Sequence, residues 1–150
     1  MPDSKLETVI SAIAARLATI TQANGYETDI GLKVFDWLPV EKMETGDLPC
    51  VSVQHPSIAI NRQPSSVWRH KPEIVVIAMN ASATDSARQA RKAAADIIAA
   101  VGTDKTFGGL VFDCDFNTVE FDVQQKDKIT AAVKVSFTVT FQTTQFNAYA

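Results

Sequence analysis

The chain has 150 residues, of which 46% are hydrophobic and 21% charged, and its formal net charge is -3. This length predicts a single domain over residues 1–150, large enough to bury a proper core. The negative charge argues against non-specific binding to nucleic acid, and no apolar run approaches the roughly 20 residues that cross a bilayer. The N-terminus lacks the basic and apolar regions of a signal peptide, so we expect a protein that is cytosolic where it is made.

The first predicted element is an amphipathic helix from Ser4 to Asn24. Ser4 and Glu7 have the spacing of a capping box, in which each side chain binds a free amide of the first turn. Apolar residues then recur at helical spacing: Leu6, Val9, Ile10, Ile13, Leu17 and Ile20. Gly25 is a suitable terminator, because glycine adopts the left-handed conformation found at helix ends.

A short strand, a charged loop and a long hairpin are predicted next. Residues 33–37 read as a strand that Pro39 ends, and residues 40–47 form the loop. A second strand begins at Val51, continues with a break at Pro56 and reaches Ile60. The polar residues 61–66 make a turn, and the strand 67–80 returns beside its partner. We therefore expect a protruding β-hairpin arm.

The centre of the returning strand, residues 74–79 (IVVIAM), is apolar on both faces. Such a strand is covered on both sides or lies at an interface, which predicts a central position in the sheet.

The second predicted helix runs from Ser82 to Val101, and Gly102 closes it. Ser82 and Asp85 again have capping-box spacing, and Thr84 is the other candidate cap. Its alanine-rich apolar face allows close packing on a sheet. The basic residues Arg88, Arg91 and Lys92 are read as a solvated face in preference to a binding patch.

Two more strands complete the chain. From residue 110 to 123 the apolar parity switches at Asn117-Thr118, which indicates a β-bulge in preference to a tight turn. Residues 130–141 (TAAVKVSFTVTF) alternate strictly, so one side of this strand is a continuous apolar row. The polar residues 142–150 are expected to form a loose tail.

The predicted order α-β-β-β-α-β-β, with strands joined mostly as hairpins, indicates an α+β fold. We expect a mostly antiparallel (mixed) β-sheet with two main helices packed on one face, plus the hairpin arm.

No catalytic, metal or cofactor site is predicted. Cys50 and Cys114 are interpreted as buried free thiols. His55 and His70 can be neighbours across the hairpin, but no third metal ligand is evident. The carboxylates around Asp113 are interpreted as solvated and not as an acid–base pair. Because no nucleophile, base and orienting group are identifiable, we expect no enzyme.

Two tryptophans beside polar loops are candidates for protein contacts. Tryptophan and arginine are enriched in interface hot spots, because they bury a large area and keep a polar group. The alternative, that each tryptophan seals the edge of its own core, is equally compatible with the sequence. The candidate contact residues are Trp37, Glu41, Lys42, Glu44, Arg62, Gln63, Trp68 and Arg69.

The chain resembles the tail-terminator (tail-completion, minor tail protein U-like) family of long-tailed bacteriophages and prophages. The resemblance runs over nearly the whole chain. It is carried by ARLATITQANGYETDIGLKVF, LPCVSV, the helix TDSARQARKAAADIIAAV and the strands FGGLVFDCDF and VSFTVTFQT. The most specific part is the stretch ANGYETDIG with the following VF, and the rest is an order of elements that other folds can share. These proteins are small α+β subunits that form a ring at the head-proximal end of the tail.

The resemblance implies a phage structural protein, hexameric in its ring, that caps the tail tube and stops its polymerisation. The implied partners are further copies of the chain, the tail-tube protein and a head-completion or neck protein. DNA would pass through the lumen without specific binding, and no membrane is involved. The implied location is the head-proximal end of the virion tail, after assembly in the bacterial host cytoplasm.

Two other classes of function remain open. One is another phage neck or tail-tube-like protein, which would polymerise differently. The other is a small-ligand-binding α+β module, which needs a pocket with convergent polar groups.

Overall fold

The computed structural model describes residues 2–38, 48–81, 85–125 and 129–150. Its elements, in chain order, are α1 (Lys5–Leu17), η1 (Gln22–Asn24), η2 (Ile30–Leu32), β1 (Val34–Asp36), β2 (Cys50–Gln63), β3 (Val67–Ala81), α2 (Ser86–Gly102), β4 (Asp113–Gln125) and β5 (Ile129–Thr144). The five strands form one sheet in the order β1-β2-β3-β5-β4. β1 pairs with β2 in parallel, and the other three pairings are antiparallel.

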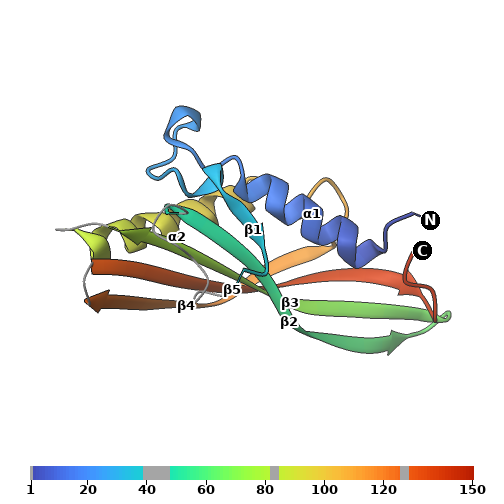
Figure 1. Ribbon diagram of the computed structural model, residues 1–150. Helices are drawn as coiled ribbons and strands as arrows, with labels where there is room; N and C mark the ends of the chain where they lie inside the picture. Colours follow the sequence, from blue (N-terminus) through green and yellow to red (C-terminus); the bar gives the residue numbers. More distant parts are fainter. Residues whose placement is uncertain (1, 39–47, 82–84, 126–128) are drawn as a thin grey trace.

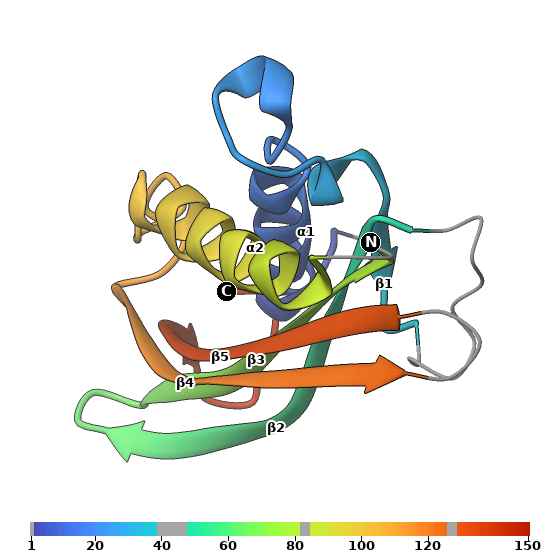
Figure 2. The same cartoon turned by 90° about the vertical axis from the view of Figure 1, so that its left-hand side faces the viewer.

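Both helices lie on the same face of the sheet (Figure 1), and α2 runs over the strands at the β5 side (Figure 2). No helix among the described residues lies over the opposite face, and we call it the open face. The predicted α+β architecture, with a mixed sheet and two helices on one side, is confirmed.

The core lies between the helices and the sheet. β5 contributes the apolar row expected from its alternation, and all five of its members are buried: Val133, Val135, Phe137, Val139 and Phe141. The helices contribute fully buried side chains that include Ile13, Leu17 and Ile97. Burying a side chain of this size stabilises the fold by about 1.5–3 kcal/mol, so this layer holds the sheet and helices together.

The first helix is shorter than predicted. The Ser4 hydroxyl accepts a hydrogen bond from the Glu7 amide at 3.2 Å, so the predicted cap is confirmed. The helix nevertheless ends at Leu17, where the Thr19 hydroxyl donates to the Arg16 carbonyl at 2.6 Å. A threonine hydroxyl that binds a nearby backbone carbonyl in this way competes with helix continuation. Gly25 is left-handed as expected, with φ of 92°, but it caps η1.

The second helix also starts later than predicted. Asp85 is its N-cap, and Ser86 is its first residue. The predicted caps Ser82 and Thr84 lie outside the described residues. The physical reason is that β3 stays paired with β5 as far as Ala81, which leaves only a short connection before the helix.

Bulges interrupt both long outer strands. In β2 the register shifts between Gln54 and Ser57, so the predicted break at Pro56 is a bulge within one continuous strand. In β4 the register shifts between Phe116 and Thr118, which leaves Asn117 without a partner residue on β5 and confirms the predicted bulge. The strand itself begins at Asp113, later than the predicted residue 110.

β3 lies at the centre of the sheet, as its apolar sequence predicted. The arm is more than a hairpin, because β5 continues alongside β3 until Thr144 pairs with Val67. The C-terminal tail is not loose, which corrects the expectation. Gln145 donates its amide to the Ser66 carbonyl at 2.9 Å, and the Ala148 carbonyl accepts from the Lys5 amide at 2.9 Å.

Candidate interaction surface

The tip of the arm is held by an aromatic contact with the C-terminal tail. Trp68 and Phe146 pack edge to face, with ring centroids 4.7 Å apart. Phe146 itself remains almost entirely exposed. An edge-to-face pair is a favourable aromatic geometry, so the tail orders the arm tip and presents an apolar ring to the surroundings.

Three further candidate contact residues lie on the arm. Arg62 is exposed and stands opposite Trp68 in the β2–β3 register, and Gln63 stands opposite Val67. Arg69 is half-buried, and its Nε is buried without a hydrogen-bond partner among the described residues. A buried donor that makes no hydrogen bond is energetically costly.

Trp37 is in a separate place. It follows β1, has a φ of 54°, and donates its amide to the Val53 carbonyl at 2.9 Å. Its ring packs edge to face on His55 at 4.8 Å and stays partly exposed. The structure therefore does not bring the two tryptophans together. Glu41, Lys42 and Glu44, the candidates in the charged loop, lie outside the described residues.

The two histidines do not face each other. His70 lies opposite Ile60 in the hairpin register, whereas His55 lies at the β2 bulge against Trp37. His70 also exchanges a hydrogen bond of 2.8 Å with the Thr143 hydroxyl. Across the described ranges no group of three His, Cys, Asp or Glu side chains can hold a metal ion.

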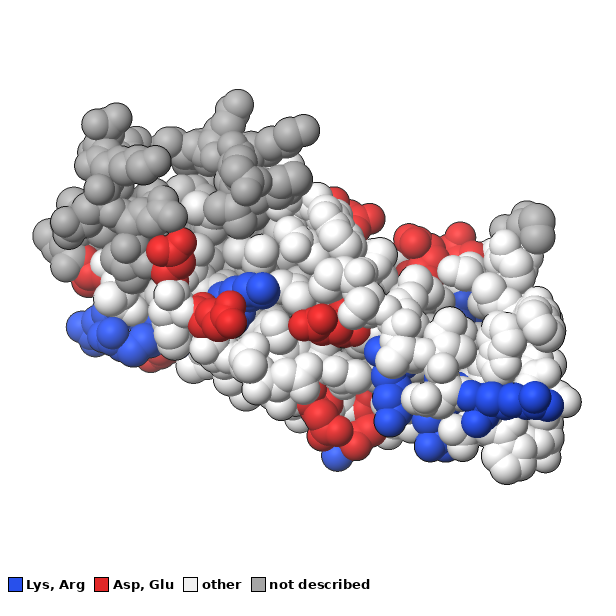
Figure 3. Space-filling model, turned by 90° about the horizontal axis from the view of Figure 1, so that it is seen from below, with Lys and Arg blue, Asp and Glu red and all other residues white. Residues whose placement is uncertain are grey.

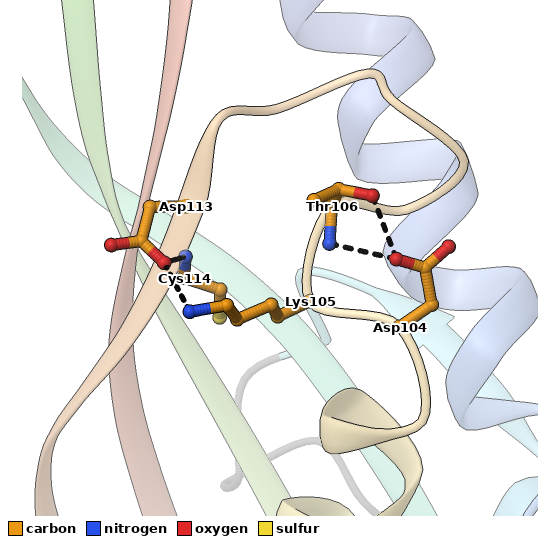
Figure 4. A network of polar contacts seen from close by, with 5 residues as sticks. All are labelled: Asp104, Lys105, Thr106, Asp113 and Cys114. Atoms are coloured by element: carbon orange, nitrogen blue, oxygen red, sulfur yellow. Dashed lines mark hydrogen bonds and ion pairs between the residues drawn. The ribbon is translucent and has the colours of Figure 1, made fainter.

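The cysteines are buried free thiols, as expected. Burial and neighbouring carboxylates raise the pKa of Cys114 to about 11, so this thiol is protonated at neutral pH and is a poor nucleophile. Lys105 contacts Asp113 at 3.1 Å, and this bond lowers the pKa of the Asp113 carboxyl (Figure 4). Asp104 accepts two hydrogen bonds from Thr106, which lower its pKa and shape the loop before β4.

The open face of the sheet is unevenly charged, and residues at its centre, among them Cys50 and Val75, are buried. β4 places acidic residues on it, among them Asp115, Glu120 and Asp122, which alternate with residues of the helix side. β3 places Arg69 and Lys71 on it, within the arm. Figure 3 views this face and shows Lys and Arg gathered at the right-hand end, where the arm lies.

The helix side of β4 carries a row of exposed apolar residues that the sequence reading missed. Phe116, Val119 and Phe121 share the face of the buried β5 row, but 37%, 36% and 52% of their surfaces are exposed. β4 is the last strand of the sheet, so nothing among the described residues lies beyond it. We call these three residues the β4 apolar strip.

A shallow cavity of about 370 Å³ lies beside α2 and is lined by Glu27, Arg88, Arg91, Lys92 and Ala95. It is open to solvent.

Within the described residues, neither helix is long and apolar enough to cross a membrane.

No family model matches the chain, and no curated protein sequence does so either. Among solved structures, a chain of the "Virion of native gene transfer agent (GTA) particle" matches with a TM-score of 0.53 and 13% sequence identity. The alignment covers 90% of this chain and 98% of the virion chain. At this low identity the similarity shows a shared fold, which extends over nearly the full length of both chains.

Proposed function

We propose that this chain is a structural subunit of a phage-like particle. The observation that carries the proposal is the fold shared with a chain of a gene transfer agent virion, because the alignment covers 98% of that chain. The candidate contact residues and the charged and apolar surfaces described above are consistent with such a role.

The specific role that we propose is that of a tail terminator. Six copies form a ring on the last ring of the tail tube, stop tube polymerisation and present a joining surface to a head-completion protein. A closed ring requires two different patches on each copy, one meeting the other on the next copy. The chain offers such differing patches, because the acidic strand β4 and the basic arm lie at different ends of the open face.

In this ring the open face lines the lumen. The acidic side chains of β4 would repel DNA phosphates and let the genome pass without sticking. The arm, and the charged loop with Glu41, Lys42 and Glu44, would supply the contacts to the tube and to neighbouring copies. The assembled protein would belong to the head-proximal end of the virion tail, with assembly taking place in the host cytoplasm.

The test is the mass of the purified protein by light scattering after size exclusion, with negative-stain imaging, in the absence and in the presence of purified tail-tube protein. A ring of about six copies that forms alone or on tube ends supports the proposal. Open-ended tubes of this chain alone would identify a tube protein instead. A chain that stays monomeric and never binds tube ends contradicts the terminator role.

A further inference from the structure

Both outer edges of the sheet are open among the described residues. β4 pairs with β5 on one side and has no partner on the other. β1 covers β2 only over Val51–Val53, so the outer edge of the arm, residues 57–63, is unpaired as well. An unpaired strand edge exposes backbone donors and acceptors that can bind another strand.

The helix sides of these two edges both carry exposed apolar residues. On β4 this side is the β4 apolar strip defined above. On the arm it is Ile60, of which 52% is exposed, and the half-buried Ile58, and the charged Arg62 follows them on the same side. If the sheet continued from one copy to the next, the helix side of β4 and the helix side of the arm would lie on the same face of the joined sheet. Their apolar side chains would then pack against each other. Contacts of this kind across strands are what stabilises a sheet.

The open faces beside the two edges carry opposite charge. β4 presents Asp115, which has no ion pair among the described residues, together with Glu120 and Asp122. On the arm the basic residues Arg69 and Lys71 come from β3, the strand next to the edge, and they stand opposite the uncharged Asn61 and Ala59 of β2.

One internal charge of opposite sign weakens each patch without cancelling it. Lys134 lies 3.9 Å from Glu120 on the β4 side, and Glu73 lies on the same face of β3 as Lys71.

We propose that the outer edge of β4 in one copy joins the outer edge of the β2 arm in the next copy, so that the sheets continue around the ring. This inference rests on the proposed ring and names its contact. Two identical β4 edges would bring carboxylates together, which is unfavourable, so the acidic residues also exclude an edge pairing with itself.

The test uses two charge-reversal variants of the full chain. One reverses the arm, with Arg69→Glu and Lys71→Glu, and the other reverses the strand, with Asp115→Lys and Asp122→Lys. Each variant alone brings like charges together at every contact, so assembly should weaken by roughly tenfold or more. An equimolar mixture restores opposite charges at every contact in a ring with an even number of copies. The chain that carries all four substitutions should assemble by itself.

Arg88→Glu with Arg91→Glu is the matched control, because it reverses two exposed charges on α2, away from both edges. Lys71→Glu alone guards against misfolding, since Lys71 is exposed whereas Arg69 is half-buried. Circular dichroism and the melting temperature establish that each variant is folded before its mass is measured.

The outcomes separate the two proposals. The edge contact is wrong if either charge-reversal variant alone forms rings as readily as the wild-type chain. It is also wrong if the equimolar mixture does not regain the ability to form rings. In both cases the proposed ring itself is unaffected. If the mixture of the two variants forms only dimers, the edge contact is also wrong, because dimers indicate a two-fold contact between the open faces of two copies. A wild-type chain that forms no ring, even on tube ends, overturns the ring and the contact together.

Discussion

Neighbouring residues of β5 face very different surroundings. Val135 and Phe137 point to the helices and are fully buried, whereas Lys134 points to the open face and is exposed. The same alternation continues on β4, but there the helix side is only partly covered. The comparison teaches that the helix-covered face determines stability, while the open face and the outer edges are available for contacts with other molecules.

The largest effect should come from the centre of the covered face. Phe137→Ala removes a fully buried ring and leaves a cavity, so we expect a loss of about 3–5 kcal/mol in the free energy of unfolding. Lys134→Ala, on the open side of the same strand, should change this free energy by no more than about 0.5 kcal/mol. Urea denaturation of both variants measures the difference, and equal losses would contradict the division between the faces.

The next effect concerns Gly31 of η2, which packs closely on the backbone at the end of α1. Gly31 is buried, and a Cβ there would meet the backbone of Leu17 and Ile20, which cannot move aside easily. Gly31→Ala should therefore destabilise the fold by about 1–3 kcal/mol. Gly102 is the control, because its Cβ would meet nothing within 4 Å. There alanine should stabilise the helix slightly, by up to about 1 kcal/mol, in the same denaturation experiment.

A third prediction concerns the buried carboxylate of Asp96 on α2. Asp96 accepts hydrogen bonds from the Thr28 amide at 2.8 Å and the Thr28 hydroxyl at 2.7 Å. Asp96→Asn turns one acceptor into a donor, so we expect a loss of about 1–3 kcal/mol and faster hydrogen exchange of the Thr28 amide. Thr28→Val, which removes only the hydroxyl, should cost less. An unchanged exchange rate would show that this carboxylate does not hold the segment.

The smallest effect appears only at high pH. The pKa of Cys114 is raised to about 11, so the folded thiol keeps its proton where the unfolded thiol, with its ordinary value of 9.0, releases it. Stability from this group is thus complete below pH 9 and falls as the pH rises toward 11. Melting temperatures of the wild-type chain and of Cys114→Ala, recorded from pH 8 to pH 11, should differ progressively less across this window. A difference in melting temperature that stays constant from pH 8 to pH 11 would contradict the raised pKa of Cys114.

The sequence predicted those parts of the fold that depend on local alternation. The buried row of β5, the bulge at Asn117 and the central position of β3 follow from which residues are apolar and at what spacing. The end of α1 was predicted wrongly, because it depends on the Thr19 hydroxyl binding the Arg16 carbonyl, which a pattern of apolar residues does not reveal. The bound tail was missed for a similar reason, since its partners Ser66 and Lys5 are far away in the sequence.

The candidate surface was predictable only in part. The arm residues Trp68 and Arg69 were chosen for their chemistry, and the structure places both on the arm; their role in contacts stays a prediction. The β4 apolar strip could not be predicted, because Phe116 and Phe121 alternate in the same way whether or not a helix covers them. Only the strand order shows that β4 is an outer strand.

The bulge in β4 also bears on how such chains can change in length during evolution. In a regular strand, removing one residue turns every later side chain to the opposite face. Asn117 is an extra residue between the paired Phe116 and Thr118, so its deletion would leave every side chain of β4 on its present face. The hydrogen bond from its amide to the Thr138 hydroxyl, at 2.9 Å, would be lost. Homologous chains can therefore gain or lose one residue here while the charged and apolar sides of the edge stay as they are.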